Sequence, residues 1–272
     1  MKRFSKMMAL GALEIASSAA MALPTVPGGP VTGPIPLPET ENSGLFVWVY
    51  NDMSGASTVQ YLGLNLNDVL PAAMTDTAGV LDFGILANFG TLFGANPSTE
   101  NVFWGVGAGD NLQVGQTNRA RIVTTGSTSL DSWATNSVPG AASALTNFLT
   151  SVNNACGATV PCSSTVATDD HNANTWGPAW RGNVVPNQAS NAIGTAANFF
   201  YAENVRSGNY VSNAYANAAG FATWLLSADG RLTYSVPAIP LPAGVWLLLS
   251  GLAGFAAVGR RKSAAGAEPL AA

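Results

Sequence analysis

The chain has 272 residues and a net charge of −4 at pH 7, because 15 acidic residues outnumber 11 lysines and arginines. Proteins that bind nucleic acid neutralise its phosphates with Lys and Arg. The composition therefore excludes nucleic acid as a partner, and the length is sufficient for one sizeable core.

The first 22 residues predict a secretory signal peptide. The stretch "MKRFSKMMALGALEIASSAAMA" starts with three cations, is largely apolar from Met7, and ends in the small-residue pattern of a signal peptidase site at Ala20 and Ala22. Cleavage after Ala22 would follow Sec-type export. A transmembrane anchor is the alternative, but Glu14 and a pair of serines interrupt the apolar run.

Residues 23–44 predict a linker. This stretch, "LPTVPGGPVTGPIPLPETENSG", is dense in proline and glycine, which favours an extended, mobile chain. We expect the folded body to occupy residues 45–237.

The body is expected to be mainly β and to resemble a β-sandwich. Aromatic and β-branched runs predict strands at 45–51, 57–66, 101–110, 119–126 and 220–236. The turn-forming "DMSGA" joins the first two strands into a hairpin, and Asp229-Gly230 favours a second tight turn. We expect Trp48, Trp104 and Trp224 in the core, and Arg119 and Arg121 on one strand face paired with carboxylates.

One α-helix is predicted within residues 137–154. Its apolar residues recur at helical spacing and so share one face: Ala141, Leu145, Phe148, Leu149 and Val152. Ser137 and Pro139 suit a helix start. Residues 188–204 fit either a helix or a strand, and we favour a strand for the second half.

The chain has two cysteines, Cys156 and Cys162. An even number of cysteines in an exported chain predicts one disulfide. A metal site is the alternative, but the sole histidine, His171, is nine residues from Cys162, and two cysteines are too few ligands for zinc. We therefore predict no metal and no cofactor.

The segment "TDDHNANTWGPAWRG" is the best single place to look for a ligand or for chemistry. A Ser-His-Asp triad would have to use His171, because the chain has no other histidine. Aromatic faces beside polar groups are also suited to a sugar. Candidate glycan contacts are Asp170, His171, Trp176, Trp180 and Arg181. A polar surface loop is the simplest interpretation, and no hydrolase motif is present.

The C-terminal region predicts a membrane span. Residues 241–259 contain no charge, and a helix of that length reaches about 28 Å, close to the hydrocarbon thickness of a bilayer. Arg260, Arg261 and Lys262 follow, and cations of this kind stay on the cytoplasmic side. We therefore expect residues 263–272 to form a cytoplasmic tail, with the body on the other side of the membrane.

The same region resembles the PEP-CTERM family of sorting tags, in its VPLPA variant. The matching features are the motif Ile239, Pro240, Leu241, Pro242 and Ala243, then the apolar run, then the basic cluster 260–262. Residues 238–262 would form the tag. The resemblance implies a substrate of an exosortase, a membrane-embedded processing enzyme of Gram-negative bacteria that also make extracellular polysaccharide.

These observations predict an exported protein without enzymatic activity. It would be held briefly in the inner membrane and then reach the cell surface or the extracellular matrix, with a structural or adhesive role in an exopolysaccharide-rich biofilm. Extracellular polysaccharide is then a candidate partner. A secreted glycan-binding module and a secreted hydrolase that uses the His171 region are the two alternatives.

Overall fold

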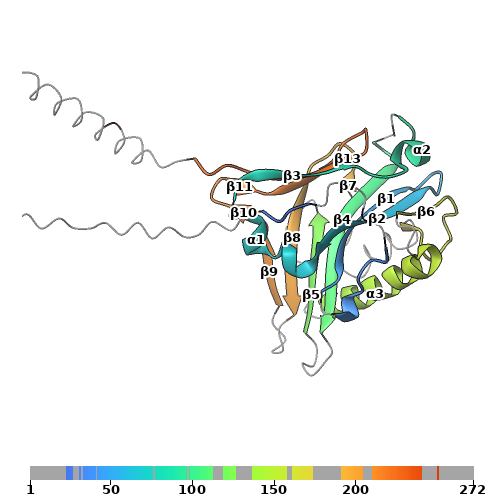
Figure 1. The fold of residues 1–272 in the computed structure, drawn as a ribbon, viewed down its shortest axis with the longest axis horizontal. Helices are drawn as coiled ribbons and strands as arrows, with labels where there is room; N and C mark the ends of the chain where they lie inside the picture. Colours follow the sequence, from blue (N-terminus) through green and yellow to red (C-terminus); the bar gives the residue numbers. More distant parts are fainter. Residues whose placement is uncertain are drawn as a thin grey trace, which may run out of the picture.

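A computed structural model provides the structure of the protein (Figure 1). It describes residues 23–26, 31, 33–40, 42–75, 77–95, 97, 99–112, 119–126, 137–157, 161–173, 191–204, 210–240 and 250. Among these residues, one antiparallel sheet of 11 strands dominates, and the prediction of a mainly β protein is confirmed.

The strands of the main sheet are, in chain order, β1 (Gly44–Asn51), β2 (Ser57–Asn65), β3 (Gly79–Ile85), β4 (Val102–Leu112), β5 (Arg119–Gly126), β6 (Cys162–Ser164), β7 (Asn191–Ala192), β8 (Ala197–Asn204), β9 (Tyr210–Ala214), β12 (Thr223–Leu226) and β13 (Arg231–Val236). Their spatial order is β3-β13-β12-β8-β5-β4-β1-β2-β6, with β7 beside β4 and β9 beside β8. A separate small hairpin joins β10 (Ala216–Asn217) to β11 (Gly220–Phe221).

The sheet is curled, and the prediction of a two-layer sandwich is replaced by one continuous sheet. Pairing continues unbroken from β3 at one edge to β6 at the other. The curl is strong enough for Ala87, just after β3, to donate its N–H to Oε1 of Gln60 on β2, at 3.0 Å. Right-handed twist accumulates over many strands, which favours curling in so wide a sheet.

The concave face of the sheet encloses an aromatic core. Its largest fully buried side chains include Trp104, Phe199, Tyr215, Trp224 and Tyr234. Two short helical segments cover this core, the 3-10 turn η2 (Leu66–Val69) and α1 (Pro71–Thr75). The Tyr215 hydroxyl donates to the carbonyl of Val69 in η2, and the Tyr234 hydroxyl donates to that of Met74 in α1.

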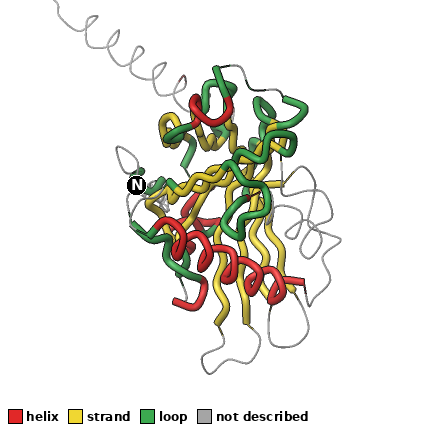
Figure 2. Tube along the Cα trace, turned by 90° about the vertical axis from the view of Figure 1, so that its right-hand side faces the viewer, coloured by secondary structure: helices red, strands yellow, loops and turns green. Residues whose placement is uncertain are grey.

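The convex face packs against the long helix α3 (Ser137–Cys156), which lies across the strands in Figure 2. The predicted helix and its predicted face are confirmed, because Ala141, Leu145, Phe148, Leu149 and Val152 are all at most 3% exposed. The helix approaches β4 closely, since a Cβ added at Gly109 would lie 2.9 Å from Cδ2 of Leu145. Two further helices, α1 and α2 (Phe89–Phe93), were not predicted; each has five residues.

Both predicted hairpins are present. β1 pairs with β2, and β12 pairs with β13 through a turn in which Gly230 has a φ of +86°. A Cβ at Gly230 would lie 2.5 Å from the Phe89 ring, so this position requires glycine for space as well as for backbone conformation. The ambiguous stretch forms β7 and β8, and Trp48, Trp104 and Trp224 are fully buried as predicted.

The predicted mobile linker is wrong for its later part. Ile35 is 1% exposed and packs in the convex core. The Asn153 side chain on α3 accepts from the N–H of Ile35 and donates to its carbonyl, both at 2.9 Å. The 3-10 turn η1 (Pro38–Thr40) follows, and the Gly44 N–H donates to the Pro36 carbonyl at 2.9 Å. An asparagine amide can satisfy one backbone donor and one acceptor together, so α3 fixes this segment despite its prolines.

Candidate functional site

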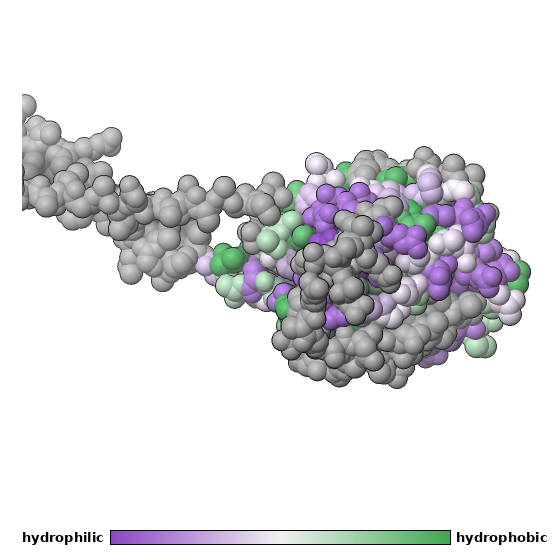
Figure 3. Space-filling model, turned by 90° about the horizontal axis from the view of Figure 1, so that it is seen from below, coloured by the Kyte–Doolittle hydropathy of each residue, from purple (hydrophilic) through white to green (hydrophobic). Residues whose placement is uncertain are grey.

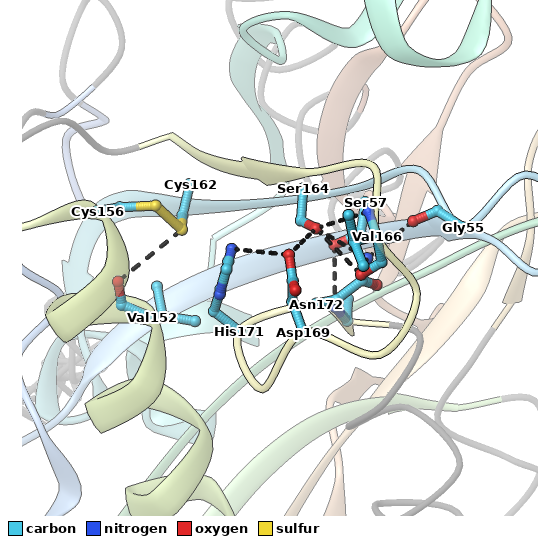
Figure 4. A network of polar contacts seen from close by, with 11 residues as sticks. Gly55, Ser57, Val152, Cys156, Cys162, Ser164, Val166, Asp169, His171 and Asn172 are labelled. Atoms are coloured by element: carbon cyan, nitrogen blue, oxygen red, sulfur yellow. Dashed lines mark hydrogen bonds and ion pairs between the residues drawn. A yellow bond between two sulfur atoms is a disulfide. The ribbon is translucent and has the colours of Figure 1, made fainter.

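A disulfide joins the end of α3 to the edge strand β6, as the cysteine count predicts. The Sγ atoms of Cys156 and Cys162 are 1.95 Å apart, and six positions separate the residues in the sequence. The bond therefore fixes the start of the loop that carries His171 against the last turn of the helix (Figure 4).

The loop after β6 is held by a buried hydroxyl. Ser164, at the end of β6, is 7% exposed. Its Oγ donates to Oδ2 of Asp169 at 2.8 Å and accepts from the Val166 N–H at 3.0 Å. Short polar side chains commonly close loops in this way by bonding to nearby backbone. The result is a compact turn with Ser164 inside it.

The Asn172 side chain connects this loop to the hairpin of β1 and β2. It is fully buried, and its Nδ2 donates to the carbonyls of Gly55 at 2.8 Å and Val166 at 2.9 Å. One residue later, the Ala173 N–H donates to the Ser57 hydroxyl at 2.9 Å. Two loops that are more than 100 positions apart in the sequence therefore form one unit.

His171 lies beside Asp169 and not beside a serine that it could activate. Its Nε2 is 3.8 Å from Oδ2 of Asp169, and the two side chains are 22% and 36% exposed. A catalytic triad places histidine between serine and carboxylate, where it can take the proton of the hydroxyl. Here the carboxylate of Asp169 stands in the middle, because Ser164 donates to it directly. This geometry suits an ion pair that forms when His171 is protonated.

Of the remaining candidate glycan contacts, the structure describes only Asp170, so it does not show these residues coming together. Asp170 is exposed on the same loop. Trp176, Trp180 and Arg181 lie outside the described residues. Sequence reasoning did not single out Ser164 or Asn172, the two residues that organise this loop.

A second polar cluster lies at one end of the concave face. Asp110 on β4 and Arg121 on β5 are directly opposite each other, with Glu203 next in the row on β8. Arg121 donates Nε–H to Oδ2 of Asp110 at 2.6 Å and its backbone N–H to Oδ1 at 3.0 Å. The predicted pairing of Arg121 with a carboxylate is confirmed; nothing is described of the Arg119 side chain.

Burial dominates the electrostatics of this cluster. The Asp110 side chain is fully buried, and burial raises its pKa, against the opposing effect of the Arg121 charge and hydrogen bonds. Tyr201 donates to Oε2 of Glu203 at 2.7 Å, and burial together with this bond raises the pKa of the phenol. Arg121 lies between the carboxylate residues Asp110 and Glu203 in this row, so the cluster is suited to joining β4, β5 and β8.

The first two residues of the predicted sorting motif are accessible. β13 ends at Val236, the Pro237 carbonyl accepts from Nδ2 of Asn217 at 2.8 Å, and Ile239 is 50% exposed. Outside the described residues lie the rest of the motif at 241–243, the basic cluster 260–262, and the signal cleavage residues Ala20 and Ala22.

No helix within the described part of the chain has the length and apolar character needed to cross a membrane; of the predicted span 241–259, only Ser250 is described. No three His, Cys, Asp or Glu residues come together as metal ligands in that same part. Comparisons of the chain with protein-family models, with curated proteins and with solved structures find no match.

Proposed function

We propose that this protein is exported, held in the inner membrane by residues 241–259, and processed at its C-terminal tag by an exosortase. Its role is structural or adhesive at the cell surface or in an exopolysaccharide matrix. The observation that carries this proposal is the order of three features after the last strand: Ile239–Ala243, an uncharged apolar run, and Arg260–Lys262.

The position of the motif supports processing. An enzyme that acts on a sorting tag needs an extended and accessible segment. The last strand of the body ends at Val236, and Ile239 is half exposed three residues later. The body therefore ends just before the motif begins.

Export is supported by the disulfide. Disulfides persist in oxidising compartments and are rare in the cytosol. In this chain both cysteines are used in one bond, Cys156–Cys162.

A surface or matrix role is supported by the charge of the body. Without the six cations of residues 1–22 and 260–262, five of the 11 remain, and without Glu14 and Glu268, 13 of the 15 acidic residues remain. The net charge of the exported part is then about −8, and this part contains no lysine. Such a body stays soluble among polysaccharides and does not adhere to nucleic acid.

The test is the intact mass of the protein from the surface and medium of its native host, compared with a strain that lacks the exosortase. We expect a species that starts at Leu23 and ends within 239–243 in the native host. The full tag should persist only in the mutant strain.

A chain that retains residues 260–272 in both strains would contradict the proposal. The C-terminal segment would then be a permanent anchor. A matched control is a variant with Arg260, Arg261 and Lys262 changed to Ser, which should accumulate unprocessed in the native host because the third feature of the tag is missing.

A further inference from the structure

The structure brings the start and the end of the exported body to the same place. Val236, the last residue of β13, pairs with Gly79, the first residue of β3. Leu23 lies beside Gly79, since a Cβ at Gly79 would be 2.9 Å from Cδ1 of Leu23. Leu23 is the first residue after the predicted signal cleavage site, and Ile239 opens the sorting motif. The predicted signal peptide and the predicted span 241–259 are therefore both connected to the same end of the body.

This end carries exposed apolar side chains. Val80, Phe221 and Ile239 are 63%, 53% and 50% exposed. Val80 pairs with Ser235 on β13, and the hairpin that contains Phe221 is tied to Pro237 through Asn217. Figure 3 shows hydrophobic surface at the left-hand end of the body, the side on which Figure 1 places β10 and β11, as well as at other places on this face.

Among the residues that the structure describes, the strands at this end carry no charge, although the exported part is acidic. No charged residue occurs in 79–81, 216–224 or 234–240. The next charges along β3 and β13 are Asp82 and Arg231, which pair with each other. A surface of anionic lipids repels carboxylates, whereas exposed aromatic and aliphatic side chains partition into the bilayer interface.

We propose that this membrane-facing end (Val80, Phe221 and Ile239) lies on the lipid bilayer while residues 241–259 anchor the chain. The inference rests on the proposed function, because it requires that span to be in the membrane. The short connection between Ile239 and the span 241–259 identifies the bilayer as the surface that this end contacts. Leu241 begins the span two residues after Ile239, and two extended residues reach about 7 Å. As long as the span is intact, this end therefore stays within reach of the bilayer.

The position of Met53 offers a matched control. Met53 is 79% exposed, more than any residue of the membrane-facing end, and lies in the turn between β1 and β2. Asn51 pairs with Val102. The Ile193 N–H donates to the Val102 carbonyl, and the Gly194 N–H donates to that of Leu226. This turn therefore lies toward the start of β13, away from Val236.

The experiment uses the full chain with the photo-crosslinking amino acid p-benzoylphenylalanine at position 221, 80 or 53. The protein is reconstituted in vesicles of phosphatidylethanolamine and phosphatidylglycerol and illuminated. Lipid adducts are quantified by mass spectrometry. Carbonate extraction reports whether the chain is inserted, and an intact disulfide with resistance to protease reports whether the body is folded.

We expect positions 221 and 80 to give several-fold more lipid adduct than position 53 in inserted, folded protein. Equal adduct at 221, 80 and 53 in inserted protein would overturn the inference and leave the proposed function standing. A chain that carbonate extracts from the vesicles would overturn the membrane step of the proposed function and the inference with it. Position 80 decides the question if substitution at 221 impairs folding.

Discussion

The two faces of the curled sheet are closed in different ways. The concave face is filled by packed aromatic rings, and hydrogen bonds from Tyr215 and Tyr234 hold the covering segments. The convex face is closed by one helix, which is fixed by the Cys156–Cys162 bond at its end and by Asn153 near it. Stability on the concave side therefore depends on side-chain volume, and on the convex side it also depends on how the helix is tethered.

The largest effect is expected from Trp224→Ala on the concave side. The ring centroid of this fully buried tryptophan lies 5.0 Å from that of Tyr234, 5.2 Å from that of Phe83 and 5.5 Å from that of Phe199. Removing it leaves a large cavity, and we expect the free energy of unfolding to fall by about 3–5 kcal/mol. Urea denaturation measures the change. Phe221→Ala, at an exposed position, is the control and should change it little; similar losses in both variants would contradict the argument.

Replacing both Cys156 and Cys162 by Ser should have the next largest effect. A cross-link over so short a loop contributes about 2 kcal/mol in the chain-entropy model. Because the bond joins α3 to β6, amide hydrogen exchange should rise in those two elements and stay unchanged in β12 and β13. Reduction of the unmodified protein with dithiothreitol should reproduce the pattern. A uniform rise over the whole sheet would show that the two faces are not independent.

Asn172→Ala is expected to have a smaller effect, localised to the loop after β6. The substitution leaves the buried carbonyls of Gly55 and Val166 without this donor, which costs about 1–2 kcal/mol. Limited proteolysis should then cut within 165–173 before any other part of the body. The exposed Asn213→Ala on β9 is the matched control. Equal protease resistance in both variants would mean that Asn172 does not hold the loop.

The smallest effect concerns the exposed pair of Asp82 and Arg231, which belongs to neither core. The Arg231 hydrogen bonds lower the pKa of Asp82 below its ordinary value of 3.8. A lowered pKa in the folded state stabilises the protein above that ordinary value, and the contribution is lost as the pH falls through the lowered one. Asp82→Asn should therefore weaken the pH dependence of stability below 3.8. Solvent screening keeps the effect small. Arg231→Gln should also weaken the pH dependence, but by less, because the Gly84 N–H still lowers the pKa of Asp82. An unchanged pH dependence in Arg231→Gln would exclude their pairing as the cause.

The elements that the sequence predicts are those whose pattern reflects burial. The continuous apolar run in β1, the alternation in β2 and β13 and the helical spacing in α3 all record which side chains face a core. β3 was not predicted, because an edge strand with Gly79, Asp82 and Gly84 lacks that alternation. The 3-10 turn η2 and the helix α1 are too short to produce a periodic signal.

The residues that hold the candidate site were harder to predict for a different reason. Ser164 and Asn172 are residue types that occur throughout this chain and are usually exposed. Only their burial shows that they organise the loop, and burial here depends on contacts more than 100 positions apart in the sequence. The same holds for Ile35, whose partner Asn153 is 118 positions away.

The place of β13 in the sheet has a consequence for how the chain would fold during the proposed export. β3 is joined to the sheet only through β13, among the pairings of the described residues, and β13 is the last strand of the body. Residues 79–85 must therefore wait for residues 231–236 before they acquire a partner. Such long-range pairing slows folding. In a chain that crosses the membrane from its N-terminus, β3 can be completed only once nearly the whole body has been translocated. A C-terminal segment that stops translocation just after β13 would give the body time to fold beside the membrane before it is released.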